Sequence, residues 1–104
     1  MAKILIVEDN EMNMRLFGDL LRSKKHEVFE CCDGAKAVSM VQEIRPDLVL
    51  MDIQMPGVDG LTATKMIRNI PEIADTKIVA VTAFAMRVQH ILHGFKKCLD
   101  RNRL

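Results

Sequence analysis

Three acidic residues follow two strongly apolar stretches of this 104-residue chain, and their positions suggest a cation site. Ile4–Val7 is followed by Glu8 and Asp9, and Leu48–Met51 is followed by Asp52. Short apolar runs of this kind are typical of buried strands in a parallel sheet, whose ligand sites lie outside the carboxyl ends of the strands. If the two strands are neighbours, three carboxylates meet, and their repulsion favours a hard cation such as Mg²⁺. The alternative is that these acids are helix caps or solvated strand ends.

Strand-like and helix-like segments alternate along the chain. Two further apolar strands are predicted at Val28–Cys32 and Lys77–Thr82. Between the strands, Asn10 is predicted to cap the first helix, Pro46 to stop the second and Pro71 to end the third. Apolar or helix-compatible residues recur at helical spacing at Leu16, Phe17, Leu20 and Leu21, at Ala37, Val38, Val41 and Ile44, and at Leu61, Thr64, Met66 and Ile67. This alternation predicts an α/β fold: a doubly wound parallel sheet with right-handed crossovers and helices on both faces.

The composition is that of one small intracellular domain. A chain of 104 residues can build one modest core. No apolar run is long enough for a membrane span, and the first apolar stretch is too short for a signal peptide, so a cytoplasmic location is expected. The three cysteines match neither a disulfide framework nor a zinc spacing, and we interpret them as small hydrophobic residues. Ten basic and thirteen acidic residues occur up to Met86, whereas five basic residues and one acidic residue follow, so the chain changes character there.

Three motifs carry a family resemblance. The chain has Ile-Val-Glu-Asp-Asn at positions 6–10, Pro-Asp-Leu-Val-Leu-Met-Asp-Ile-Gln-Met-Pro at 46–56 and Ala-Val-Thr-Ala at 80–83. In this order and spacing they resemble the receiver domain of bacterial response regulators, the CheY-like family, over residues 1–86. Within the family, Glu-Asp-Asn-Glu-Met-Asn-Met at positions 8–14 and Ala-Val-Thr-Ala-Phe-Ala-Met at 80–86 are most similar to DivK-type single-domain cell-cycle regulators or to the receiver of a hybrid histidine kinase. The resemblance implies a flavodoxin-like fold with strand order 2-1-3-4, in which the first and third strands are adjacent.

The resemblance also assigns a role to each residue of the site. Asp52 would accept a phosphoryl group, Asp9 would bind Mg²⁺ directly, Glu8 would bind it through water, and Gln54 would offer its backbone carbonyl. Thr82 would donate a hydrogen bond to the phosphoryl group and move inward, although by residue type alone it is a β-branched residue that fits a strand. The implied function is a phosphoacceptor receiver domain of a two-component phosphorelay, phosphorylated with Mg²⁺ and signalling by protein–protein interaction. It is not an enzyme beyond catalysing its own aspartyl phosphorylation from a phosphohistidine donor.

The expected partners are a histidine kinase or histidine phosphotransfer protein and a downstream signalling protein, with no nucleic acid and no membrane. An aspartyl-phosphate phosphatase would need an acid in place of Gln54.

The lysine and proline that the family places about twenty residues after the threonine do not occur, because Leu104 stands at about that position. We therefore expect the fifth strand and last helix to be missing and the fourth strand to be an edge open to self-association. The alternative function is a degenerate or truncated receiver that binds proteins independently of phosphorylation.

Residues 87–104 form an atypical tail after the receiver core of residues 1–86. Helical spacing of its apolar residues, with basic residues off the apolar stripe, predicts an amphipathic basic helix. We interpret it as the fourth helix of the fold in altered sequence, and the alternative is a helix that binds a partner or a membrane. His90, His93 and Cys98 could bind a metal, but two histidines three residues apart on a helix also suit a solvated face.

Overall fold

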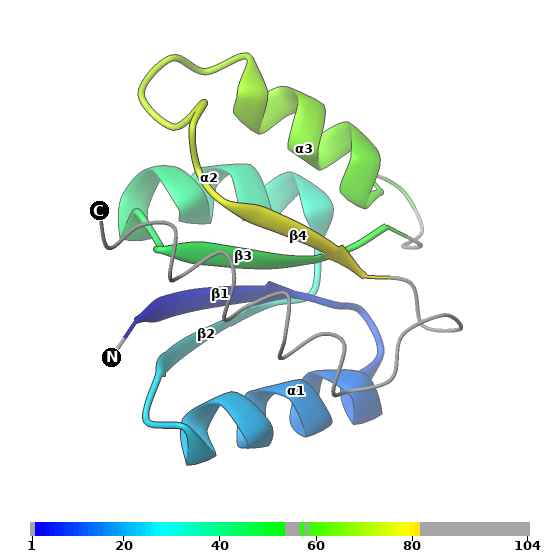
Figure 1. Ribbon diagram of the computed structural model, residues 1–104. Coiled ribbons are helices and arrows are strands. Elements are labelled where there is room, and N and C mark those ends of the chain that lie inside the picture. Colours follow the sequence, from blue (N-terminus) through cyan, green and yellow to red (C-terminus); the bar gives the residue numbers. More distant parts are fainter. Residues whose placement is uncertain (1, 54–56, 58, 82–104) are drawn as a thin grey trace.

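Four parallel strands and three helices make up the part of the chain that the computed structural model describes, residues 2–53, 57 and 59–81 (Figure 1). In chain order they are β1 (Lys3–Val7), α1 (Glu11–Ser23), β2 (Glu27–Cys31), α2 (Gly34–Ile44), β3 (Leu48–Asp52), α3 (Gly60–Arg68) and β4 (Ile78–Val81). The sheet order is β2-β1-β3-β4 with every pair parallel, which confirms the predicted topology. The predicted tail helix, and the expected absence of a fifth strand and a last helix, concern residues outside the described part of the chain.

The two central strands divide the core into two layers, because successive side chains of a strand point to opposite faces. In Figure 1, α1 covers one face of the sheet, and α2 and α3 cover the other. On the α1 side the buried residues include Ile4, Ile6, Phe17, Leu21, Leu48 and Leu50. On the other side they include Leu5, Val7, Val41, Val49, Met51, Ala63 and Ile67. All five residues of β3 are buried, as expected for an interior strand covered on both faces.

Each helix begins at an Asn or Asp whose side chain accepts a backbone N–H from the first turn. The caps are Asn10, Asp33 and Asp59, with donor-to-acceptor distances of 2.8–3.0 Å. Asn10 was predicted as a cap, whereas Asp33 and Asp59 were not. The second helix ends at Ile44, where Arg45 adopts a left-handed conformation with φ of 53° just before Pro46.

Several apolar residues that have helical spacing face solvent. Leu16, Leu61 and Met66 are 51%, 57% and 42% exposed, although they recur at helical spacing with buried residues of the same helices. In α1 the buried positions are Met14, Phe17, Gly18 and Leu21, and in α3 they are Gly60, Ala63 and Ile67. Small residues therefore occupy several of the buried positions of these two helices. Among the described helices, none has both the length and the apolar character required to cross a membrane.

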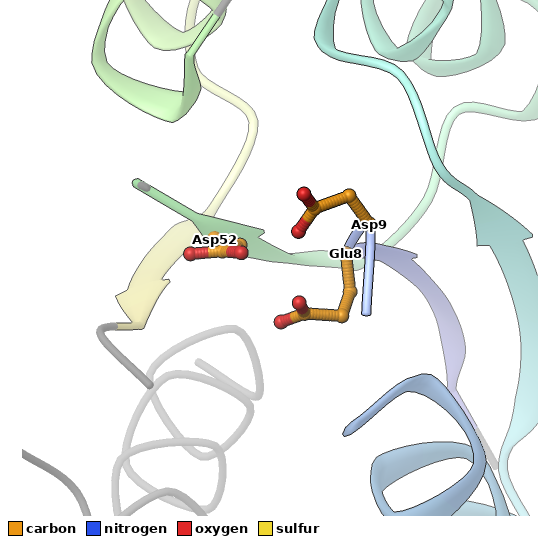
Figure 2. Close-up of side chains that lie close together, drawn as sticks. All are labelled: Glu8, Asp9 and Asp52. Carbon is orange, nitrogen blue, oxygen red and sulfur yellow. The ribbon is translucent and has the colours of Figure 1, made fainter. Parts of the chain in front are cut away.

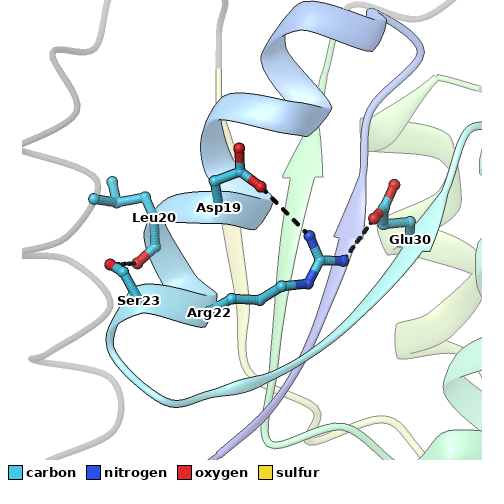
Figure 3. Close-up of polar contacts among 5 residues, drawn as sticks. All are labelled: Asp19, Leu20, Arg22, Ser23 and Glu30. Atoms are coloured by element: carbon cyan, nitrogen blue, oxygen red, sulfur yellow. Dashed lines mark hydrogen bonds and ion pairs between the residues drawn. The ribbon is translucent and has the colours of Figure 1, made fainter.

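Arg22 connects α1 to the edge strand β2 (Figure 3). Its guanidinium contacts Glu30 of β2 at 2.6 Å and lies 3.8 Å from Asp19, one turn earlier in α1. Nearby, the Ser23 hydroxyl donates to the Leu20 carbonyl at 2.5 Å in the last turn of the helix. Because Arg22 and both acids are substantially exposed, we expect each ion pair to contribute only about 0.2–1 kcal/mol.

Candidate functional site

Glu8 and Asp52 lie at the carboxyl ends of the two central strands, on the same face of the sheet. The register of β1 and β3 pairs Ile6 with Leu50. Glu8 and Asp52 are each two residues further on, so strand alternation brings them next to each other on the side covered by α1. Only 4% of Glu8 and 3% of Asp52 is exposed, which is rare for carboxylic acids. The strands therefore hold two acids together where water hardly reaches.

Asp9 supplies the third carboxyl group, from the loop between β1 and α1, and it is exposed. One carboxylate oxygen from each of Glu8, Asp9 and Asp52 can be chosen so that all three lie within 4.8 Å of one another. Figure 2 shows the three side chains directed toward a common region beyond the ends of the strands. The Asn10 N–H donates to Glu8 Oε1 at 3.1 Å, which connects this carboxyl group to the start of α1.

The electrostatics of this cluster oppose full ionisation. The pKa of Glu8 is raised from 4.5 to about 7, chiefly by burial and to a smaller extent by the carboxyl groups of Asp52 and Asp9, against the opposing effect of the Asn10 N–H. Glu8 and Asp52 are also hydrogen-bonded, which requires a proton between two carboxyl groups. At neutral pH the cluster therefore holds a proton part of the time, and a cation could replace that proton.

The donor set fits a hard divalent cation. Three carboxyl groups offer only oxygen ligands, which Mg²⁺ and Ca²⁺ prefer, and the exposed side of Asp9 leaves room for water or a phosphoryl group. Next to Glu8 and Asp9, a cleft of about 540 Å³ extends between the start of α1 and the end of β2. Its lining includes five acidic residues and two arginines, Arg15 and Arg22. The geometry thus suits metal-assisted chemistry on an oxyanion at the end of β3.

Two residues predicted for the site, Gln54 and Thr82, lie outside the described residues, so their roles stay predictions. The structure does place the residue before Thr82, because Val81 pairs with Asp52 in the register of β3 and β4. The Ile53 N–H donates to the Val81 carbonyl at 3.1 Å, so the two strands remain bonded just beyond Asp52.

One feature of the site was missed at the sequence level. Gly60 is the first residue of α3 and packs directly on the backbone of Asp52 and Ile53. The only signal in the sequence was the Asp-Gly pair at 59–60. Read as a capping aspartate followed by the first residue of a helix, this pair would have placed Gly60 at the start of α3.

The sequence model described as the response regulator receiver domain matches residues 4–101, nearly the whole chain. The chain belongs to the response regulator receiver family. Among curated relatives of this receiver domain is the polar-differentiation response regulator DivK of Brucella anthropi. The two are 46% identical over 84 residues, which make up 81% of this chain and 68% of the relative.

Solved structures of receiver domains share the fold. The receiver domain of a sensor histidine kinase from Pseudomonas aeruginosa, solved with a magnesium ion coordinated in its active-site cleft, is 36% identical with a TM-score of 0.76, covering 86% of this chain and 74% of that one. The response regulator TrrA from Thermotoga maritima, solved in complex with Mg²⁺ and BeF, is 25% identical with a TM-score of 0.84, covering 94% of this chain and 99% of that one.

Proposed function

We propose that this receiver domain accepts a phosphoryl group on Asp52 from a phosphohistidine in a two-component phosphorelay. The observation that carries the proposal is the position of Asp52 at the buried end of the central strand, beside Glu8 and Asp9. Phosphoryl transfer depends mainly on positioning and on neutralisation of charge. A carboxylate held by a rigid strand next to a cation site meets both requirements.

In the proposed transfer, a carboxylate oxygen of Asp52 bonds to phosphorus, and the bond between phosphorus and the donor imidazole nitrogen breaks. The electron pair of that bond stays on the imidazole. Asp9 and Asp52 would hold Mg²⁺ directly, Glu8 would hold it through water, and Gln54 would contribute its backbone carbonyl. The bound ion supplies positive charge that offsets the phosphoryl oxygens. Thr82 would donate a hydrogen bond to the acyl phosphate and move inward when it forms.

A histidine kinase or a histidine phosphotransfer protein is the proposed donor, and a downstream signalling protein is the proposed output. Met12 and Leu16, one turn apart on the outer face of α1, are 81% and 51% exposed. They follow directly on the loop that carries Glu8 and Asp9, so a donor protein that reaches the acids would contact them. Exposed apolar residues beside a site support protein docking there.

Intact-mass spectrometry after incubation with acetyl phosphate and Mg²⁺ tests the function. We expect one phosphoryl group per chain, none without the metal, and none on the Asp52→Asn variant. The matched control is Asp47→Asn at the opposite end of the same strand, where the carboxylate accepts the Lys3 N–H at 2.7 Å. Phosphorylation of the Asp52→Asn variant, or an equal loss of phosphorylation in Asp52→Asn and Asp47→Asn, would contradict the assignment of Asp52 as the phosphoacceptor.

A phosphorylation-independent binding module is the second candidate, and the exposed Met12 and Leu16 favour it as well. Self-association through β4 belongs to this candidate, because β4 is an edge of the described sheet and Ala80 is exposed. Sedimentation at several protein concentrations tests the self-association. A lysine on an edge strand blocks edge pairing, so Ala80→Lys should shift any dimer to monomer, whereas Ala35→Lys on the exposed face of α2 should not. A monomer at all concentrations contradicts self-association.

A further inference from the structure

The start of α3 is packed against the peptide that carries the proposed phosphoacceptor. Gly60 is buried, and a Cβ atom added to it would lie 2.8 Å from the carbonyl carbon of Asp52 and 2.8 Å from Cα of Ile53, and nearer still to the Asp52 carbonyl oxygen. These are backbone atoms, so no flexible side chain can move aside. Ordinary contacts between such atoms are about 3.5–4.0 Å long. Only glycine therefore fits between the helix and the strand.

Space, and not backbone conformation, explains the glycine. Gly57 has a φ of 76°, in the left-handed region, but an added Cβ there would meet nothing within 4 Å. Gly60 has no positive φ and is the first residue of a regular helix. The Asp59 side chain fixes that helix start by accepting the Thr62 N–H at 2.8 Å.

The peptide between Asp52 and Ile53 is thus held from two sides. On the other side from Gly60, the Ile53 N–H is bonded to the Val81 carbonyl. The Asp52 carboxyl group extends from this same short backbone segment into the acid cluster. Any displacement of the segment by α3 moves the carboxyl group relative to Glu8 and Asp9, which come from β1 and its loop.

We infer that Gly60 is a positioning residue for Asp52, setting the acceptor carboxylate in line for phosphoryl transfer. This inference rests on the proposed function. A methyl group at position 60 would displace the Asp52 backbone by about 1 Å, and a misplacement of that size can lower a reaction rate on the order of a hundredfold. Gly60→Ala should therefore lower the maximal rate of Asp52 phosphorylation about a hundredfold in protein that remains folded.

The experiment compares phosphorylation rates from acetyl phosphate at saturating Mg²⁺, measured by intact mass, with the folded fraction measured by circular dichroism. Ala63→Gly is the first control, because it weakens the same helix without adding atoms beside Asp52. Gly18→Ala is the second, because its added Cβ would meet only the end of the Arg22 side chain. Both controls should keep the rate within about threefold of the original protein when corrected for folded fraction.

A second pair of variants covers the case in which Gly60→Ala does not fold. Asp59→Ala removes the cap that fixes the start of α3, and Asp33→Ala removes the equivalent cap of α2. We expect the rate to fall about tenfold or more for Asp59→Ala and to stay unchanged for Asp33→Ala. If the original protein takes no phosphoryl group, the proposed function fails and this inference fails with it. If the original protein is phosphorylated and Gly60→Ala and Asp59→Ala match their controls, the positioning role alone is overturned.

Discussion

Replacing Glu8 with glutamine should stabilise the metal-free protein at alkaline pH. The pKa of Glu8 is raised from 4.5 to about 7, mainly by burial. Between these pH values the folded protein keeps a proton that the unfolded chain has released. The stability contributed by this group is therefore full below about pH 4.5 and is lost as the pH rises through about 7. Glutamine stays neutral throughout, so Glu8→Gln should escape this loss.

The size of the effect follows from the same pKa values. A rise from 4.5 to about 7 corresponds to about 3–4 kcal/mol at roughly 1.4 kcal/mol for each unit of pKa. We expect Glu8→Gln and the original protein to have similar free energies of unfolding near pH 4.5. The difference should then grow to about 3–4 kcal/mol in favour of the variant near pH 8.5. Because glutamine can still hydrogen-bond to Asp52 and to the Asn10 N–H, the substitution changes the charge and little else.

Urea denaturation in the presence of a chelator, followed by circular dichroism, measures this difference. The chain has neither tryptophan nor tyrosine, so intrinsic fluorescence is a poor probe. Glu43→Gln, at an exposed position of α2, is the matched control and should track the original protein at every pH. Excess Mg²⁺ near pH 8.5 should stabilise the original protein more than Glu8→Gln, since a ligand of the folded state stabilises it by mass action. A Glu8→Gln difference that stays constant with pH would refute the reasoning.

Two further predictions concern His26 and the outer face of α1. The Nδ1 atom of His26 accepts the Ala2 N–H at 3.2 Å, and burial lowers the pKa of this histidine. The stability that neutral His26 contributes to the folded protein is therefore full above about pH 6.5 and is lost as the pH falls through the lowered pKa. In the urea assay, His26→Gln should make the free energy of unfolding depend less steeply on pH in the acid range. An unchanged slope of the free energy of unfolding against pH would contradict the role given to His26. Met12→Ser should slow phosphoryl transfer from phosphorylated histidine phosphotransfer domains but not from acetyl phosphate. Leu61→Ser, at an exposed leucine of α3, should affect neither reaction, and equal slowing by both variants would exclude α1 as the docking face.

Local sequence patterns were sufficient to predict which segments form strands and helices, and to which side of the sheet the side chains of a strand point. Apolar runs ending on Glu8 and Asp52 predicted two buried strands, and period-two alternation is sufficient to place each acid on the same side as the apolar residue two positions before it. The cap at Asn10 was predicted from residue type and position, because a cap is an interaction between residues only three apart. These inferences succeeded because they depend on neighbours in the chain.

Only the tertiary structure decided how separate elements meet. The pairing of β1 with β3 joins residues more than forty positions apart, and without it the three acids would not converge; at the sequence level that adjacency came from family resemblance. The raised pKa of Glu8 depends on burial and on charges from two strands. The outward position of Leu16 and the close fit of Gly60 on Asp52 depend on how each helix packs on the sheet. Helical periodicity gives the spacing of a face but not which face turns inward, because that choice is made by packing between distant segments.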